Sequence, residues 1–203
     1  LPRVFRTEDE ALFREKLQRF PQLSAVAVGN LGHLPIVEGL GLEVRGDFGL
    51  NVFNSRALAF LRELGLASAT VSSELRHQQV RDLAKLLPCE GIVYGRLPLM
   101  VMENCITKNN VGCRHGAGST LTDRTGAQFP VQCVYGCRNE IENSLPLFLA
   151  DKAEWRRCGL TSARLRFTTE TADECAAVLR RYRGEGDYAP EKYTRGLFYR
   201  GVE

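Results

Sequence analysis

The chain has 203 residues, of which 44% are hydrophobic and 25% charged, and a formal net charge of +3. This composition excludes wholesale disorder, and the length can bury the core of one domain with room for a small appendage. The charge is too small to identify a nucleic-acid-binding protein, because such proteins concentrate a basic excess on one face.

Nothing in the sequence resembles a membrane span or a secretion signal. No apolar run approaches the roughly 18 residues that a membrane helix needs. The first segment, Leu1–Phe20, is charged throughout, unlike a signal peptide. We therefore expect a cytoplasmic protein without a membrane segment.

In the first half of the chain, short β-branched runs alternate with helical patterns. The expected strands are Ala25–Asn30, Ala69–Leu75 and Gly91–Met102, and the expected helices are Leu34–Leu40, Arg56–Leu64 and His77–Leu87. Ser55 is the expected cap of the second helix, and Leu42–Asn54 reads as an extended segment. Strands separated by helices of roughly ten residues predict a parallel sheet or barrel, with ligands beyond the carboxyl ends of the strands. A full barrel needs roughly 250 residues, so the expected fold class is α/β with a partial TIM-like barrel.

The second half changes character. Asn104–Gln132 is polar and rich in glycine, and Thr122–Val131 within it reads as a hairpin. The remaining expectations are a strand or short helix at Leu145–Lys152, a strand at Ser162–Phe167, a helix at Thr171–Tyr182 and an irregular tail at Gly184–Glu203. We expect three parts: residues 1–103 as β/α units of an incomplete barrel, 104–150 as a cysteine-bearing loop and hairpin, and 151–203 as a βα unit and tail packed on the same domain.

Seven cysteines are the most chemically informative residues. In a chain without a secretion signal, an odd number of cysteines indicates metal binding or buried thiols before disulfides. Cys105 and Cys113 lie in one polar loop, and Cys133 and Cys137 form a CxxxC pair. Together these thiols would suit a structural zinc or a [4Fe–4S] cluster, although the spacing is neither that of a zinc ribbon nor that of a ferredoxin. The alternative is that they are small buried hydrophobes, as we expect for the other three, Cys89, Cys158 and Cys175.

Polar residues at expected strand ends are weaker candidates. Asp47, Glu74, Asn30 and Asn51 could line a pocket as acid, base or polar groups, or could cap the following helices. Arg96 interrupts an apolar strand, so it either pairs with an acid such as Glu74 or meets an anionic ligand.

The C-terminal tail carries a second pair of candidates. Arg195 and Arg200 alternate with aromatic residues and could contact phosphates while the rings stack on bases. The alternative is that the rings pack on the domain and leave the arginines in solvent. The histidines, His33, His77 and His115, form no recognisable catalytic constellation.

Several segments together resemble the collagenase-like peptidases of family U32. They are Gly46–Asn54, Ser72–Leu83, Val93–Cys105, Thr122–Val131, Tyr135–Lys152 and the ending YTRGLFYRGVE. The resemblance begins near Ala25 and is to the C-terminal part of the domain in the long bacterial members. It implies a TIM-like barrel whose N-terminal half is missing here, so that the isolated fragment is expected to be inactive. It also implies that Cys105, Cys113 and Cys137 share a site, with Cys133 the least secure of the four.

The resemblance leaves three functions open. Several family members are associated with hydroxylation of a base in transfer or ribosomal RNA, which depends on cysteines thought to hold an iron–sulfur cluster and on prephenate metabolism. We expect this type of function, with tRNA or rRNA as partner of the whole protein. The first alternative is a collagenase-like peptidase, for which Cys105 as nucleophile and His115 as base are conceivable. The second is a zinc-stabilised scaffold without catalysis.

Overall fold

The computed structural model describes residues 1–113 and 119–202 of the chain. His115, considered above as a base, therefore lies outside the described residues. The chain forms two compact units, which we call unit 1 and unit 2. Unit 1 comprises Leu1–Ile92, Ala153–Arg164 and Gly196–Glu203, and unit 2 comprises Val93–Lys152 and Leu165–Arg195. The fold is mixed α/β, with one largely parallel sheet and one antiparallel sheet.

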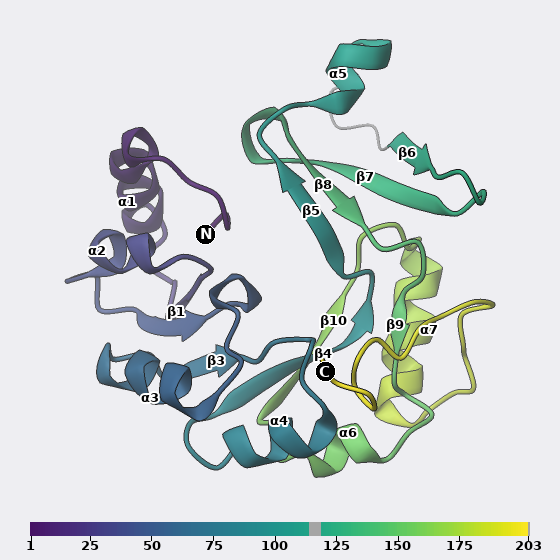
Figure 1. Cartoon of the computed structure of the whole chain (residues 1–203). Helices are drawn as coiled ribbons and strands as arrows, with labels where there is room; N and C mark the ends of the chain where they lie inside the picture. The colour runs from purple at the N-terminus through teal and green to yellow at the C-terminus, as the bar shows by residue number, and fades with distance from the viewer. Residues whose placement is uncertain (114–118, 203) are drawn as a thin grey trace. The chain divides into compact units, whose positions relative to one another are not determined.

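Unit 1 is built from parallel strands joined by helices (Figure 1). The strands are β1 (Ala25–Val28), β2 (Glu43–Gly46), β3 (Ser68–Thr70), β4 (Cys89–Gly95) and β10 (Ser162–Arg166), which lie in that order. The helices are α1 (Glu10–Gln18), α2 (Leu34–Val37), α3 (Ser55–Glu63), α4 (His77–Leu83) and α6 (Glu154–Arg157). The alternation confirms the α/β prediction, but the described residues form no closed barrel.

Alternation along the strands separates an apolar face from a polar one. Val26 and Val28 of β1 are buried, whereas Ala25 and Ala27 point to the other face and are half-buried. Helix α3 covers the apolar face with Leu58, which is fully buried, and Leu61. On the opposite face the register aligns Ala27 with Arg45, Arg45 with Ser68 and Thr70 with Glu90. This second face therefore carries charged and hydroxyl groups.

Two local predictions for unit 1 need correction. The cap of α3 is Asn54, whose side chain accepts a hydrogen bond from Ala57 N at 2.9 Å, and not Ser55. The strand expected at Ala69–Leu75 ends at Thr70, with only an isolated bridge between Val71 and Val52 beyond it.

The strand expected at Gly91–Met102 is wrong in a more important way, because it consists of two strands in two different sheets. β4 ends at Gly95, and β5 (Pro98–Met102) begins three residues later in the antiparallel sheet. Gly95 has φ of +111°, and a Cβ there would lie 1.9 Å from the carbonyl oxygen of Arg166. Pro98 has no N–H to continue a ladder. Position 95 therefore admits only glycine, and the first sheet ends there.

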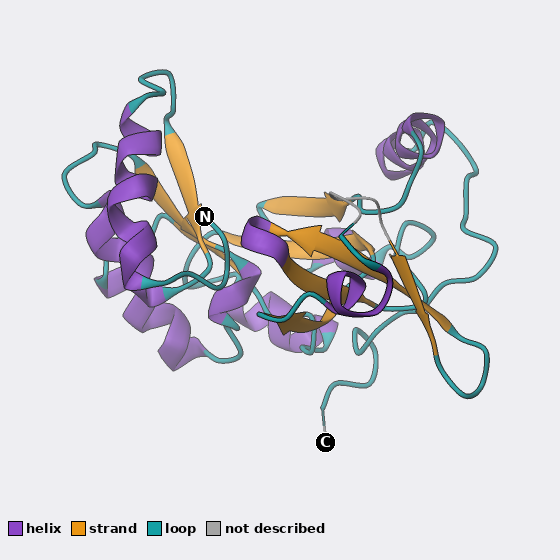
Figure 2. Ribbon diagram, turned by 90° about the horizontal axis from the view of Figure 1, so that it is seen from above, coloured by secondary structure: helices purple, strands orange, loops and turns teal. Residues whose placement is uncertain are grey.

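Unit 2 contains the antiparallel sheet, in the order β5-β8-β7-β6. Besides β5, the strands of this sheet are β6 (Ser119–Thr122), β7 (Gln128–Val134) and β8 (Arg138–Glu142). Unit 2 also contains α5 (Ile106–Val111), α7 (Ala172–Arg183) and β9 (Leu147–Phe148), which pairs with β4. The predicted hairpin is confirmed, and Asp123 closes its turn by accepting from the backbone N–H groups of Thr125 and Ala127. Helix α7 begins with the predicted cap, Thr171. The tail after α7 is loop, as predicted (Figure 2). Helix α5, in a segment expected to be loop, was missed.

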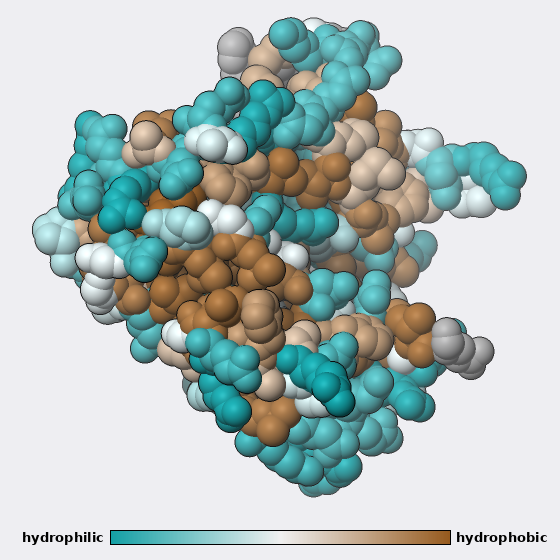
Figure 3. All heavy atoms as spheres, turned by 60° about the vertical axis from the view of Figure 1, so that its left-hand side comes forward, coloured by the Kyte–Doolittle hydropathy of each residue, from teal (hydrophilic) through white to brown (hydrophobic). Residues whose placement is uncertain are grey.

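The surface mixes hydrophilic and hydrophobic areas (Figure 3). The largest apolar exposures include Leu99 at 55% and Met100 at 52%, both on the edge strand β5. Within the described residues, no helix has the length and apolar character needed to cross a membrane.

Candidate functional site

The four candidate metal ligands all belong to unit 2 and sit around one end of the antiparallel sheet. Cys105 follows β5 and caps α5, with its Sγ accepting from Lys108 N at 3.4 Å. Cys113 follows α5, Cys133 lies in β7, and Cys137 ends the short 3-10 helix between β7 and β8. Cys105 is half-buried and the other three are exposed, and none of the four is in a disulfide.

Asn139 links the segment of Cys105 to the strands that flank Cys133 and Cys137. Its side chain is fully buried in β8, where the residue pairs with Met102 of β5 on one side and Cys133 of β7 on the other. Its Oδ1 accepts a hydrogen bond from the backbone N–H of Ile106 at 2.8 Å. The first turn of α5, and with it Cys105, is therefore tied to the middle of the sheet beside Cys133.

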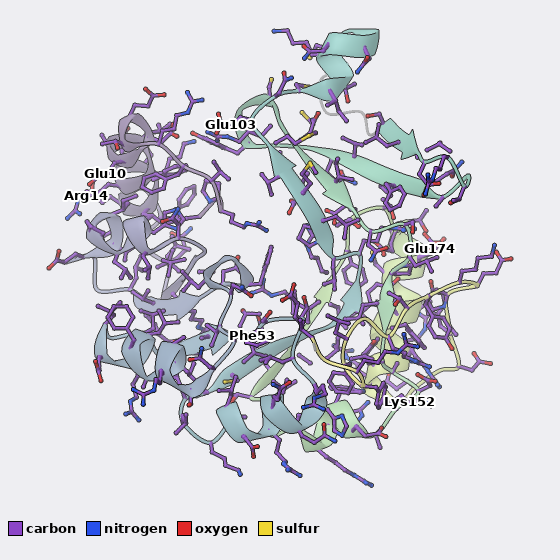
Figure 4. The ribbon with its side chains drawn as sticks, in the orientation of Figure 1. Glu10, Arg14, Phe53, Glu103, Lys152 and Glu174 are labelled. Atoms are coloured by element: carbon purple, nitrogen blue, oxygen red, sulfur yellow. The ribbon has the colours of Figure 1, made fainter. Side chains whose placement is uncertain are left out.

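A second contact joins the residues next to Cys105 and Cys137. Arg138 donates from Nε to Glu103 Oε1 at 2.8 Å, and its side chain is only 8% exposed. Its guanidinium carbon also lies 5.8 Å from the ring centroid of Tyr135. Glu103 lies just beyond the end of β5 (Figure 4). This partly buried pair holds the segment before Cys105 against the start of β8.

Two further features shape the cysteine segments. The hydroxyls of Thr107 and Ser119 are 2.8 Å apart and join α5 to β6. Cys137 has φ of +62°, which is unusual for a residue with a side chain. Backbone strain of this kind is found preferentially at ligand-binding and catalytic positions.

The pKa of one of these thiols is raised. Burial raises the pKa of the Cys133 thiol, and the neighbouring thiolates of Cys105, Cys137 and Cys113 raise it further. Thiolates are the donors that zinc and iron–sulfur clusters prefer, so the donor set fits such a group. Among the described residues, however, no three candidate ligands are close enough to form a ready-made metal site.

Two of the four polar strand-end candidates, Asn30 and Asp47, cap 3-10 helices with their side chains. Asn30 accepts from Gly32 N at 2.9 Å and Asp47 from Phe48 N at 2.8 Å. Asn51 ends a 3-10 helix with φ of +47°. Glu74 is exposed, and its backbone N–H donates to Ser72 Oγ at 3.3 Å.

Asp47 also belongs to an ionic network that sequence reasoning missed. Arg164 of β10 donates to Asp47 Oδ1 and lies 2.5 Å from Glu90 Oε1. Thr70 Oγ1 donates to the same carboxylate at 2.9 Å. The network lies on the polar face of unit 1, beside a cavity of about 240 Å³. The sequence offered one indication of this network. The alternation in Ser162–Phe167 predicts a strand and places Arg164 on one of its faces.

The three arginine candidates have different surroundings. Arg96 donates to the carbonyl oxygens of Asn143 and Ser144 and to Thr169 Oγ1. Arg195 forms a bidentate pair with Asp151 at 2.5 and 2.6 Å, and its guanidinium carbon lies 4.7 Å from the ring centroid of Tyr193. Arg200 is exposed, and its backbone N–H bonds to Leu197 O. The guanidinium of Arg195 is therefore paired with an acidic side chain of the protein itself.

The described histidines offer no general base for a nucleophile. His33 is fully buried and neither ring nitrogen has a hydrogen-bond partner in the described structure. The ring of His77 lies against Phe198 and Tyr199, and its Nδ1 is 3.4 Å from Phe198 O. Within the described residues, no hydrogen bond joins either imidazole to a serine, threonine or cysteine side chain.

Comparison with protein families gives a match. The sequence profile of Peptidase family U32 matches residues 4–139, which include all four candidate ligands. Comparison with curated proteins found no match. Comparison with solved structures likewise found none.

Proposed function

The chain belongs to peptidase family U32, and from this premise we propose that it is part of a metal-dependent protein that hydroxylates or otherwise modifies a base in tRNA or rRNA. The proposed metal ligands are Cys105, Cys113, Cys133 and Cys137, and the proposed group is a [4Fe–4S] cluster. Such a cluster would supply electron transfer. We also propose that β1–β4 form part of a (β/α) barrel, which their parallel order supports.

The observation that carries the proposal is the link between the separate cysteine segments. Asn139 ties Ile106 to the strand beside Cys133, and Arg138 ties Glu103 to the residue after Cys137. These contacts are made by side chains of low exposure, which cost free energy to bury unless they are satisfied. They hold cysteine-bearing segments near one another without any bond between the thiols, an arrangement that suits a group bound by all of them.

The family membership is equally consistent with a collagenase-like peptidase. Proteolysis needs an activated nucleophile or a metal-bound water. The contacts of His33 and His77 give no support to an activated nucleophile in the described residues. Four thiolates would also suit zinc, which makes the zinc scaffold the closest competitor of the cluster.

The first experiment is metal and sulfide analysis of protein purified without oxygen. We expect iron and sulfide, with a broad absorbance near about 400 nm, and loss of both in Cys105→Ser and Cys137→Ser. Cys175→Ser is the matched control, because Cys175 is a half-buried helix residue outside the cluster. One zinc per chain with no sulfide would support the scaffold instead. Unchanged metal content in both cysteine variants would contradict a shared site.

The second experiment tests the reaction. Cellular tRNA and rRNA are digested to nucleosides and compared by mass spectrometry between cells with the wild-type protein and cells with Cys105→Ser. A hydroxylated nucleoside that disappears in the variant and persists with Cys175→Ser is the expected result. Gelatin hydrolysis by the wild-type protein that is lost in Cys105→Ser, with no change in any nucleoside, would favour the peptidase.

A further inference from the structure

A second potential binding site lies in unit 2, in a cavity of about 500 Å³. This volume falls within the range of small-molecule sites. Its walls come from the end of β4, the loop before β9, the loop before α7 and the tail after α7, and its charged lining residues include Arg96, Glu170, Glu174 and Lys192. Glu174 marks the first turn of α7 in Figure 4. None of the cysteines lines this cavity.

Arg96 is a fixed cation on this cavity wall. Its NH1 donates to Asn143 O at 2.8 Å and to Ser144 O, and its Nε donates to Thr169 Oγ1 at 3.3 Å. These partners are neutral, so they orient the guanidinium without neutralising it. In the described structure no carboxylate forms an ion pair with Arg96.

Glu170 is a fixed anion on the same wall. Its Oε2 accepts from the backbone N–H groups of Thr168 and Thr169 at 2.7 and 3.0 Å, and its Oε1 accepts from Tyr94 OH at 3.2 Å. These three hydrogen bonds fix the orientation of the carboxylate. The described residues provide no ion-pair partner for Glu170 either.

Arg96 and Glu170 lie close to each other, because both form a hydrogen bond with Thr169. Thr169 accepts from Arg96 through its hydroxyl and donates to Glu170 through its backbone N–H. The two charged groups therefore bond to the same residue, a proximity suited to a ligand whose own charges are a few bonds apart. Leu145, Pro146 and Tyr188 add apolar surface to the same cavity.

From this juxtaposition we propose that the cavity binds a small zwitterion of the amino-acid type. The ligand carboxylate pairs with Arg96, whose planar guanidinium suits a carboxylate, and the ligand ammonium pairs with Glu170. The charged lining residues are three carboxylates, Glu170, Glu174 and Glu191, and two cations, Arg96 and Lys192. This excess of acidic groups disfavours a phosphate-rich ligand. A free amino acid and the terminus of a dipeptide share this chemistry.

The test is isothermal titration of the whole chain with the common amino acids and a set of dipeptides. For the best ligand, we expect its methyl ester and its N-acetyl derivative each to bind at least about tenfold more weakly, because each lacks one charge-assisted interaction. Dipeptides that bind more tightly than any amino acid would identify a peptide as the source of the zwitterion. Equal binding of blocked and unblocked ligands would overturn the proposal, as would no heat of binding by any zwitterion at millimolar concentration.

Protein variants give an independent arm of the same test. Arg96→Gln and Glu170→Gln should each weaken zwitterion binding at least about tenfold, whereas Arg183→Gln and Glu185→Gln, at exposed positions outside the cavity, should leave it unchanged. Because Arg96→Gln removes contacts that hold two loops, circular dichroism is recorded for each variant. If Arg96→Gln unfolds, the ester and N-acetyl ligands still decide the result on the wild-type chain. Stronger binding of inorganic phosphate than of any zwitterion would also contradict the proposal.

Discussion

The carboxamide oxygen of Asn139 accepts a hydrogen bond from the backbone N–H of Ile106 at 2.8 Å across 33 residues of sequence. One buried amide thus ties the first turn of α5, directly after Cys105, to the strand that pairs with Cys133.

The first prediction concerns this amide. Asn139→Ala should lower the free energy of unfolding by about 1–3 kcal/mol, because it leaves a backbone N–H without its partner. It should also weaken Zn²⁺ binding by at least about tenfold if the cysteines share a metal. The measurements are chemical denaturation and metal titration with a chromophoric competitor. Asn109→Ala is the control, because Asn109 is exposed and its side chain contacts Asn104. Equal metal affinity of Asn139→Ala and the wild type would contradict the positioning role.

The second prediction concerns the strand break. Gly95→Ala should prevent folding or destabilise the chain by more than about 4 kcal/mol, because the new Cβ would lie 1.9 Å from Arg166 O at a positive φ. Gly126 also has positive φ, but nothing lies within 4 Å of a Cβ there. Gly126→Ala should therefore cost only about 1 kcal/mol. Soluble yield and thermal denaturation separate the two, and similar stability of both variants would show that the close approach at Gly95 is unimportant.

The third prediction concerns Arg164. Arg164→Met should destabilise the chain by about 3 kcal/mol, because Asp47 and Glu90 would lose their shared cation while remaining largely buried. Adding Glu90→Gln to this variant should restore part of the loss, since one of the two uncompensated charges is removed. Urea denaturation of the single and double variants measures both effects. A double variant less stable than Arg164→Met would indicate that Glu90 has a more important contact elsewhere.

The fourth prediction is a pH dependence of unit 1. Burial lowers the pKa of His33 to about 4, and its ring lies 4.8 Å from that of Phe5. Below about pH 6.5 the unfolded chain binds a proton that the folded chain excludes. Stability should therefore fall as the pH is lowered from about 6.5 to about 4, with a contribution from His33 of about 3 kcal/mol. Chemical denaturation at several pH values across this range measures the effect. The free energy of unfolding should change less with pH in His33→Phe than in the wild type, and an identical pH dependence of the two would refute the assignment.

Local chemistry made part of the fold predictable. The Thr171 cap of α7, the Asp123 turn and the alternation of β10 each depend on residues within a few positions of one another. The break at Gly95 could not be predicted in this way, because the carbonyl that excludes a side chain there belongs to Arg166, which is distant in sequence. Helix α5 could not be predicted either, because it too depends on a contact with a residue distant in sequence. Its polar sequence has little helical periodicity, and its first turn is bonded to Asn139 from another strand.

The candidate sites, too, could be predicted only in part from the sequence. The cysteine types and their approximate grouping were accessible from sequence, because thiol chemistry belongs to the residue itself. The contacts that link the cysteine segments were not, because Asn139 and Arg138 read as ordinary strand residues. Arg96 was noticed as a charge in an apolar run, but its role depends on three neutral partners and on Glu170, which only the folded chain brings together.

The division into units has a practical consequence for dissecting this protein. The chain passes from one unit to the other within β4, before α6, within β10 and after Arg195. No single cut separates the units, and any contiguous segment that contains all of unit 2 also carries Ala153–Arg164 of unit 1. Removing that segment would take α6 and most of β10 from unit 1. Deletion mapping would thus damage both units at once, whereas point substitutions can probe the cysteines and the zwitterion cavity one at a time.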